Sequence, residues 1–161
     1  MTRASTWTNA DGLVVGFGKN FPQTTGAETK NYTGLGGAQT ALTRFTWKDL
    51  NGGVTINVPV PKGAKVTDVR LVVDAAFTST GTNTITVGDG SDADGFITAA
   101  QADTTTLVAT GVIVGAGAYL VADTDTTAPQ FKTYTAADTI DLASAQTDWT
   151  AGAATLVVTY A

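Results

Sequence analysis

The stretch KVTDVRLVVDAAF (residues 65–77) decides the fold class of this chain of 161 residues. Its odd positions from 69 to 77 carry Val, Leu, Val, Ala and Phe, whereas Asp68, Arg70 and Asp74 occupy even positions. A β-strand turns successive side chains to opposite faces, so one face would be buried and the other wet. A helix would scatter the three charged residues around its axis. The pattern therefore predicts a long strand.

Shorter stretches on both sides of this strand have the same character. Residues 54–60 alternate in the same way, and Pro59 and Pro61 favour an edge strand because proline donates no backbone hydrogen bond. The 32 Thr, 25 Ala and 18 Gly, against a single Glu, suit strands and turns better than helices. We expect an all-β, antiparallel β-sandwich, jelly-roll-like, over residues 43–161. Further strands are predicted at 45–50, 82–88, 107–114, 119–122, 130–135, 139–143 and 153–161, and a short helical turn at 96–103.

The first 42 residues follow neither period, and glycines interrupt them seven times. This segment is predicted to be an extended N-terminal arm, ordered only where something covers it. It holds too many apolar groups to leave in water, so it packs either on a partner or on its own body, and we favour the partner. The predicted anchors of the arm are Trp7, Leu13, Val15, Phe17, Phe21 and Tyr32.

Charge is divided unevenly along the chain. Residues 1–70 hold eight of the nine Lys and Arg and four acids, whereas residues 71–161 hold one Lys and ten Asp. Scattered basic residues and an acidic second half argue against nucleic-acid binding. The short apolar run from Leu13 to Phe17 is too short for a secretory signal or a membrane span. We expect a soluble protein that binds neither nucleic acid nor membrane.

The residue types offer little chemistry. The chain has no His, no Cys and four scattered Ser, which removes the usual general bases and nucleophiles, so no enzyme and no cofactor are predicted. Residues 88–95 (GDGSDADG) resemble a calcium loop, but in EF-hand register Ser91, Ala93 and Asp94 fall at positions 3, 5 and 6, so the register fails. An acidic turn with side-chain-to-backbone bonds is predicted, and a calcium ion bound there remains the alternative.

Four segments carry a resemblance to a known family. They are VTINVPVPKGAKVTDVRLVVDAAF (54–77), TITVGDGSDADGF (84–96), and YTAADTID (134–141) with the closing AGAATLVVTY (151–160). In this order they resemble a family of small virion proteins of tailed phages, over roughly two thirds of the chain. The resemblance implies a structural component of the capsid, a decoration or cement protein that is trimeric at threefold positions. It carries over no catalytic or ligand residues.

Together these observations predict a non-enzymatic capsid decoration subunit on the outside of the virion, assembled in the host cytoplasm. Its predicted partners are the major capsid protein, which the arm would contact, and two further copies in a homotrimer. The alternative is a receptor- or carbohydrate-binding module of a head fibre or tail, in which an exposed Trp149 or Tyr119 would stack on a sugar. Trp47 alternates with Phe45 and is predicted to be core.

Overall fold

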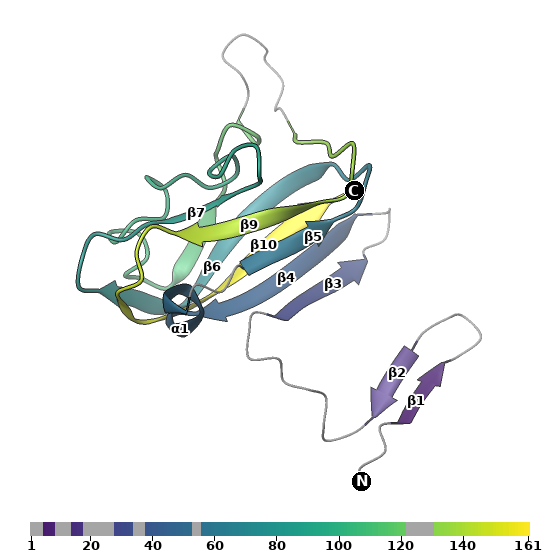
Figure 1. The fold of residues 1–161 in the computed structure, drawn as a ribbon, viewed down its shortest axis with the longest axis horizontal. Helices are drawn as coiled ribbons and strands as arrows, with labels where there is room; N and C mark the ends of the chain where they lie inside the picture. Colours follow the sequence, from purple (N-terminus) through teal and green to yellow (C-terminus); the bar gives the residue numbers. More distant parts are fainter. Residues whose placement is uncertain (1–4, 9–13, 18–27, 34–37, 53–55, 122–130) are drawn as a thin grey trace.

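A computed structural model of the chain describes residues 5–8, 14–17, 28–33, 38–52, 56–121 and 131–161 (Figure 1). All paired strands in it are antiparallel, and they form one two-stranded, one five-stranded and one three-stranded sheet. The five-stranded sheet has the order β3-β4-β10-β6-β8, and the three-stranded sheet has the order β5-β9-β7. The elements are β1 (Ser5–Thr8), β2 (Val14–Phe17), β3 (Glu28–Thr33), β4 (Gln39–Thr46), α1 (Trp47–Asn51), β5 (Ile56–Val60), β6 (Val66–Ser79), β7 (Ile85–Gly88), β8 (Gly111–Val114), β9 (Asp138–Ser144) and β10 (Trp149–Tyr160).

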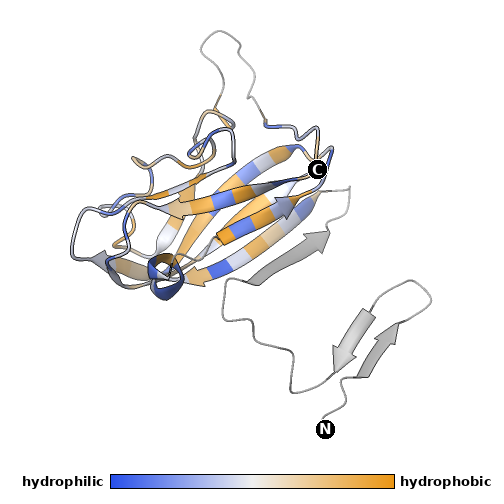
Figure 2. Ribbon diagram, viewed as in Figure 1, coloured by the Kyte–Doolittle hydropathy of each residue, from blue (hydrophilic) through white to orange (hydrophobic). Residues whose placement is uncertain are grey.

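The two larger sheets pack face to face, with the three-stranded sheet in front of the five-stranded sheet in Figure 1. Apolar and polar residues alternate along their strands, as Figure 2 shows by colour. The apolar positions of both sheets turn inward and form one buried core. The predicted all-β sandwich is therefore confirmed, whereas its jelly-roll character stays a prediction.

Strand β6 contains most of the stretch from which the fold class was predicted. Val69, Leu71, Val73 and Phe77 are buried, as the odd-position rule requires. Ala75 is exposed, because the register against β10 shifts at this point of the strand. Such an irregularity adds a residue on one strand and breaks the strict period of two.

Three aromatic rings fill the end of the core next to α1. The ring centroids of Phe45 and Phe77 are 6.1 Å apart, and those of Phe77 and Trp149 are 5.3 Å apart in an edge-on arrangement. Gly152 (φ +129°) lies against the Phe77 ring, in a conformation that L side chains rarely adopt. The absence of a side chain at residue 152 lets β10 pass close to this ring.

Strand β5 confirms the interpretation of its prolines. Ile56, Val58 and Val60 are buried, Pro59 is exposed, and β5 lies at the edge of the three-stranded sheet. An edge strand has one row of backbone groups without a neighbouring strand, so the N–H that proline lacks is not missed there.

Five of the predicted strands are wrong or too long. The segment predicted as a strand at 130–135 forms, in its described part, only an isolated bridge between Thr133 and Lys65, and of the strand predicted over 82–88 only residues 85–88 form a strand, β7. Residues 47–51 form the helix α1, because the Asp49 carboxylate accepts hydrogen bonds from the Thr46 N–H (2.8 Å) and hydroxyl (2.9 Å) and starts a helical turn. In the segment predicted as a strand at 119–122, the described residues 119–121 form a turn instead, since the N–H groups of Leu120 and Val121 donate to the Gly117 carbonyl. Of the strand predicted over 107–114, only residues 111–114 pair, in β8.

Part of the segment predicted to be an arm lies in strands. Strand β3 pairs with β4 from Glu28 to Thr33, so both belong to the five-stranded sheet, and the boundary predicted after residue 42 lies inside β4. Strands β1 and β2 pair with each other in a sheet of their own. Among the described residues, no helix is both long and apolar enough to span a bilayer.

Candidate assembly surface

The exposed edge of β8 is the part of the described surface where large apolar side chains gather. Val112 is 55% exposed and Val114 is 53% exposed, and the flanking Val108 and Val121 are also exposed. Ile113, between the two strand valines, packs against the core. Because side chains alternate along a strand, Val112 and Val114 must project from the opposite, outer face of the five-stranded sheet.

The backbone of β8 is open along the edge of the sheet. The strand pairs with β6 and has no strand on its other side within the described chain. The Gly115 N–H donates to the Val69 carbonyl at 2.8 Å, so the peptide groups in phase with residue 115 face β6, and those of Val112 and Val114 face outward. The Gln101 side chain donates from Nε2 to the Val114 carbonyl oxygen at 3.0 Å and so occupies one outward group.

The outer face of the five-stranded sheet continues this surface with a mixture of aliphatic, threonine and arginine side chains. One row across the sheet contains Leu42, Val157, Arg70 and Val114, and the next contains Arg44, Thr155, Val72 and Val112. The apolar members outside β8 are half-buried. Short and β-branched side chains lose little rotamer freedom when a neighbour covers them, which suits a contact surface.

Charges on this face are tied to one another. The Arg70 Nε lies 2.7 Å from an Asp68 carboxylate oxygen. The Thr155 hydroxyl donates to Asp74 Oδ2 at 2.8 Å, and the Arg44 Nε lies 4.0 Å from the same oxygen. Exposed pairs of this kind add little stability, but they leave few free charges beside the valines.

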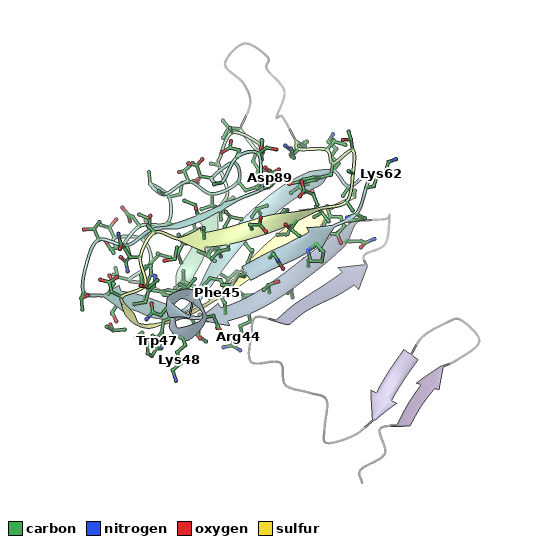
Figure 3. All side chains as sticks on the ribbon, viewed as in Figure 1. Arg44, Phe45, Trp47, Lys48, Lys62 and Asp89 are labelled. Carbon is green, nitrogen blue, oxygen red and sulfur yellow. The ribbon has the colours of Figure 1, made fainter. Side chains whose placement is uncertain are left out.

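The acidic turn at residues 88–95 contains a buried carboxylate rather than an open ligand site. The Asp89 side chain is completely buried, at the end of β7 (labelled in Figure 3). Its Oδ1 accepts the N–H groups of Ser91 (2.9 Å) and Asp92 (3.0 Å), which confirms the predicted side-chain-to-backbone bonds of the turn. Within the described part of the chain, no three acidic side chains gather as a metal site would require.

Three side chains from distant parts of the sequence complete the surroundings of Asp89. The Tyr119 hydroxyl donates to Oδ1 at 3.1 Å, the Tyr134 hydroxyl donates to Oδ2 at 3.0 Å, and Lys132 Nζ lies 3.3 Å from Oδ2. Lys132 Nζ also lies 4.3 Å from the centroid of the Tyr119 ring and donates to its hydroxyl. The carboxylate therefore has five donors, and this saturation marks it as a structural group.

The pKa values around Asp89 follow from burial and hydrogen bonding. Burial alone raises the pKa of Asp89, but the hydrogen bonds from Ser91, Asp92, Tyr134 and Lys132 outweigh it and hold the pKa below its usual value. Burial raises the pKa of Tyr134, and the nearby negative charge of Asp89 raises it further. Asp89 therefore stays ionised and Tyr134 stays neutral at ordinary pH.

Four of the six predicted arm residues lie in strands β1, β2 and β3, and the other two lie outside the described residues. Trp7 lies in β1 opposite Val15 of β2, and Phe17 of β2 lies opposite Ser5. Tyr32 lies in β3 opposite Thr40 of the five-stranded sheet. Leu13 and Phe21 lie outside the described residues. The backbone thus brings Trp7 and Val15 together, and the role of all six anchors stays a prediction.

The predicted sugar platform is wrong for Trp149. Its side chain is 2% exposed, packs on Phe77, and donates from Nε1 to the Ser144 hydroxyl at 2.7 Å. Tyr119 is half-buried and uses its hydroxyl on Asp89. A ring with buried faces has no surface to offer a sugar. Trp47 is partly buried against the core, from α1 rather than from a strand.

Comparisons with known proteins give fold neighbours. No family model matches the sequence, and no curated protein matches it significantly. The fold is similar to a chain in a solved structure described as the acidic stable capsid structure of Helicobacter pylori bacteriophage KHP30, with a TM-score of 0.53 and 16% identity over 83% of this chain and 91% of that chain. A chain of the cyanophage Pam1 capsid asymmetric unit gives a TM-score of 0.48 and 21% identity, over 96% of each chain. At such identities the likeness to the KHP30 chain is a statement about fold.

Proposed function

We propose that this chain is a structural protein of a phage virion, and specifically a decoration (cement) subunit that binds the outside of the head. The observation that carries the proposal is the likeness in fold to a chain of a phage capsid structure, over most of both chains. The order of the motifs in residues 54–161 resembles phage virion proteins independently of that likeness. The proposed localisation is the exterior of the virion, after assembly in the host cytoplasm.

The surface supports a role in protein contacts. The strand edge at β8 leaves apolar side chains and backbone hydrogen-bonding groups open together. Such edges pair readily with other chains unless they are blocked or covered. A protein that works as a monomer in solution gains nothing from this arrangement, whereas an assembling subunit uses it.

The proposed mechanism is mechanical and thermodynamic. The sandwich forms a homotrimer, and the arm of residues 1–42 contacts neighbouring major capsid protein subunits through Trp7, Leu13, Val15, Phe17, Phe21 and Tyr32. A ligand that binds only the assembled shell stabilises it by mass action. Several linked contacts in one trimer raise the avidity beyond that of a single arm. A shell bridged in this way resists outward pressure better than a bare one.

The test uses virions of the phage that encodes the chain, prepared with its gene deleted, and the purified full-length chain added back. We expect the chain to sediment with the particles and to raise their temperature of disruption. A Trp7→Ser, Phe17→Ser variant should bind at least tenfold more weakly, because each substitution removes a large apolar anchor.

A Thr6→Ser, Thr8→Ser variant is the matched control, since it changes polar residues in the same strand as Trp7. It should bind as the unaltered chain does. Particles that ignore the full-length chain would refute the proposed function, and equal binding by the two variants would refute the role of the arm.

A further inference from the structure

The free edge of β8 can pair with one additional strand. Val112 and Val114 turn their peptide groups away from β6, and their side chains are more than half exposed on the outer face. The Gln101 side chain bonds the Val114 carbonyl, and no strand of the described chain pairs with the N–H and C=O of Val112 or with the N–H of Val114. The edge therefore offers both hydrogen bonds and an apolar margin, as strand addition requires.

The hairpin of β1 and β2 lacks a third strand within the described chain. The two strands pair only with each other within the described chain, and each is four residues long. A two-stranded hairpin without a further layer or strand is marginally stable in water. The sequence of β2, Val14-Val15-Gly16-Phe17, is apolar throughout, so the hairpin needs an apolar surface to rest on.

We propose that strand β2 of one molecule adds to the β8 edge of a second copy of this chain. The lengths match, since both strands have four residues. A second copy is the occupant because, in the single chain, neither β1 nor β2 pairs with β8, and the chain enters the five-stranded sheet through β3, at the edge opposite β8. The Gln101 amide, which bonds the Val114 carbonyl, yields its place to an N–H of the incoming strand.

Charge supports the same pairing. Arg3 and Lys19 bracket the hairpin in the sequence, whereas the half of the chain that contains β8 has ten Asp and one Lys. Opposite charges around a contact direct the two partners toward the correct approach. The inference rests on the proposed function, because it takes the chain to work as an assembly of copies. It assigns the backbone edge of β2 to contact between copies, and the apolar side chains of the arm keep their proposed contact with the capsid.

The experiment replaces Val112 with the photo-crosslinking residue p-benzoylphenylalanine in an unlabelled full-length chain. This protein is mixed with an equal amount of ¹⁵N-labelled unaltered chain, in solution and bound to particles, and is then irradiated. Trypsin cleaves after Arg3 and Lys19 and so releases the hairpin as the single peptide of residues 4–19. We expect crosslinks between residue 112 and the labelled 4–19 peptide.

The matched control carries the same residue in place of Ala143, which is exposed on the three-stranded sheet. It should give at least tenfold less crosslinking to peptide 4–19. Replacement of Val114 repeats the test at the second exposed position, in case the bulky group at 112 itself blocks docking. Crosslinks to the unlabelled 4–19 peptide only, crosslinks only to other peptides, or none in either setting would overturn the inference. Particle binding by the unaltered chain, measured separately, would then leave the proposed function intact.

Discussion

The Asp89 turn and the β8 edge differ in which groups they bury and which they expose to solvent. At the turn, a charged carboxylate is completely buried and has five donors around it. At the edge, apolar side chains face solvent and backbone groups stay open. A buried charge with every partner present has its function inside the fold, whereas an apolar edge without partners has its function outside it. The contrast separates the structural site from the proposed assembly site.

The largest expected effect comes from removing the buried charge. Asp89→Asn keeps the shape of the side chain but leaves Lys132 without its ion pair, so the free energy of unfolding should fall by about 3 kcal/mol. Asp68→Asn is the control, because it breaks the shorter but exposed pair with Arg70 and should cost at most about 1 kcal/mol. Urea denaturation of the three proteins measures both changes. Equal losses would mean that burial does not distinguish the two carboxylates.

The backbone of the acidic turn gives the next largest effect. A Cβ at Gly88 would meet the Asp92 carbonyl and the backbone of Ala93, whereas a Cβ at Gly90 would meet open space. Gly88→Ala should therefore lower the free energy of unfolding by about 2 kcal/mol. Gly90→Ala, two residues away in the same turn, should change it by less than about 1 kcal/mol. Thermal unfolding followed by circular dichroism compares the pair, and a tolerant Gly88 would show that the turn is loosely packed.

Acid should weaken the turn through the same carboxylate. The pKa of Asp89 is lowered in the folded protein, so its stabilisation is complete above the unfolded pKa of about 3.9 and is lost as the pH falls through the folded pKa. Hydrogen bonds from Thr105 and Thr80 lower the pKa of Asp103 and Asp148 in the same direction. The difference in unfolding free energy between the unaltered chain and Asp89→Asn isolates Asp89. It should be constant from pH 7 to about 5 and shrink below about 4; a constant difference down to pH 2 would contradict the assignment.

The period-two pattern predicted the framework of the sandwich because it records which face of a strand is buried. It succeeded for β6 and β5, where alternating residues meet the core. It failed at residues 47–51, where the bonds between Thr46 and Asp49 start a helix in spite of the alternation of Phe45 and Trp47. Local hydrogen bonding competes with periodicity over such short stretches, and a pattern alone does not rank the two.

The candidate site was harder to predict than the fold. The run of β-branched residues in Gly111–Val114 predicts a strand but not which face meets the core, because apolar residues occupy consecutive positions of it. The side chains that contact Asp89 lie 30 to 45 residues away in sequence, so its burial could not be recognised from the turn. The predicted arm residues Trp7 and Val15 are brought together by β1 and β2, and only their sequence suggested a contact surface.

The smallest effect on folding should accompany a clear effect on assembly. Val112→Thr exchanges one exposed methyl group for a hydroxyl, so the free energy of unfolding should change by less than about 0.5 kcal/mol. Ile113→Thr, one residue further along, places a hydroxyl against the core and should cost about 2 kcal/mol. Light scattering over a concentration series should show weaker self-association for Val112→Thr than for Ile113→Thr. If Val112→Thr instead destabilised folding as much as Ile113→Thr, the valine would be packed under its own chain, and the edge of β8 would be as closed as the turn around Asp89.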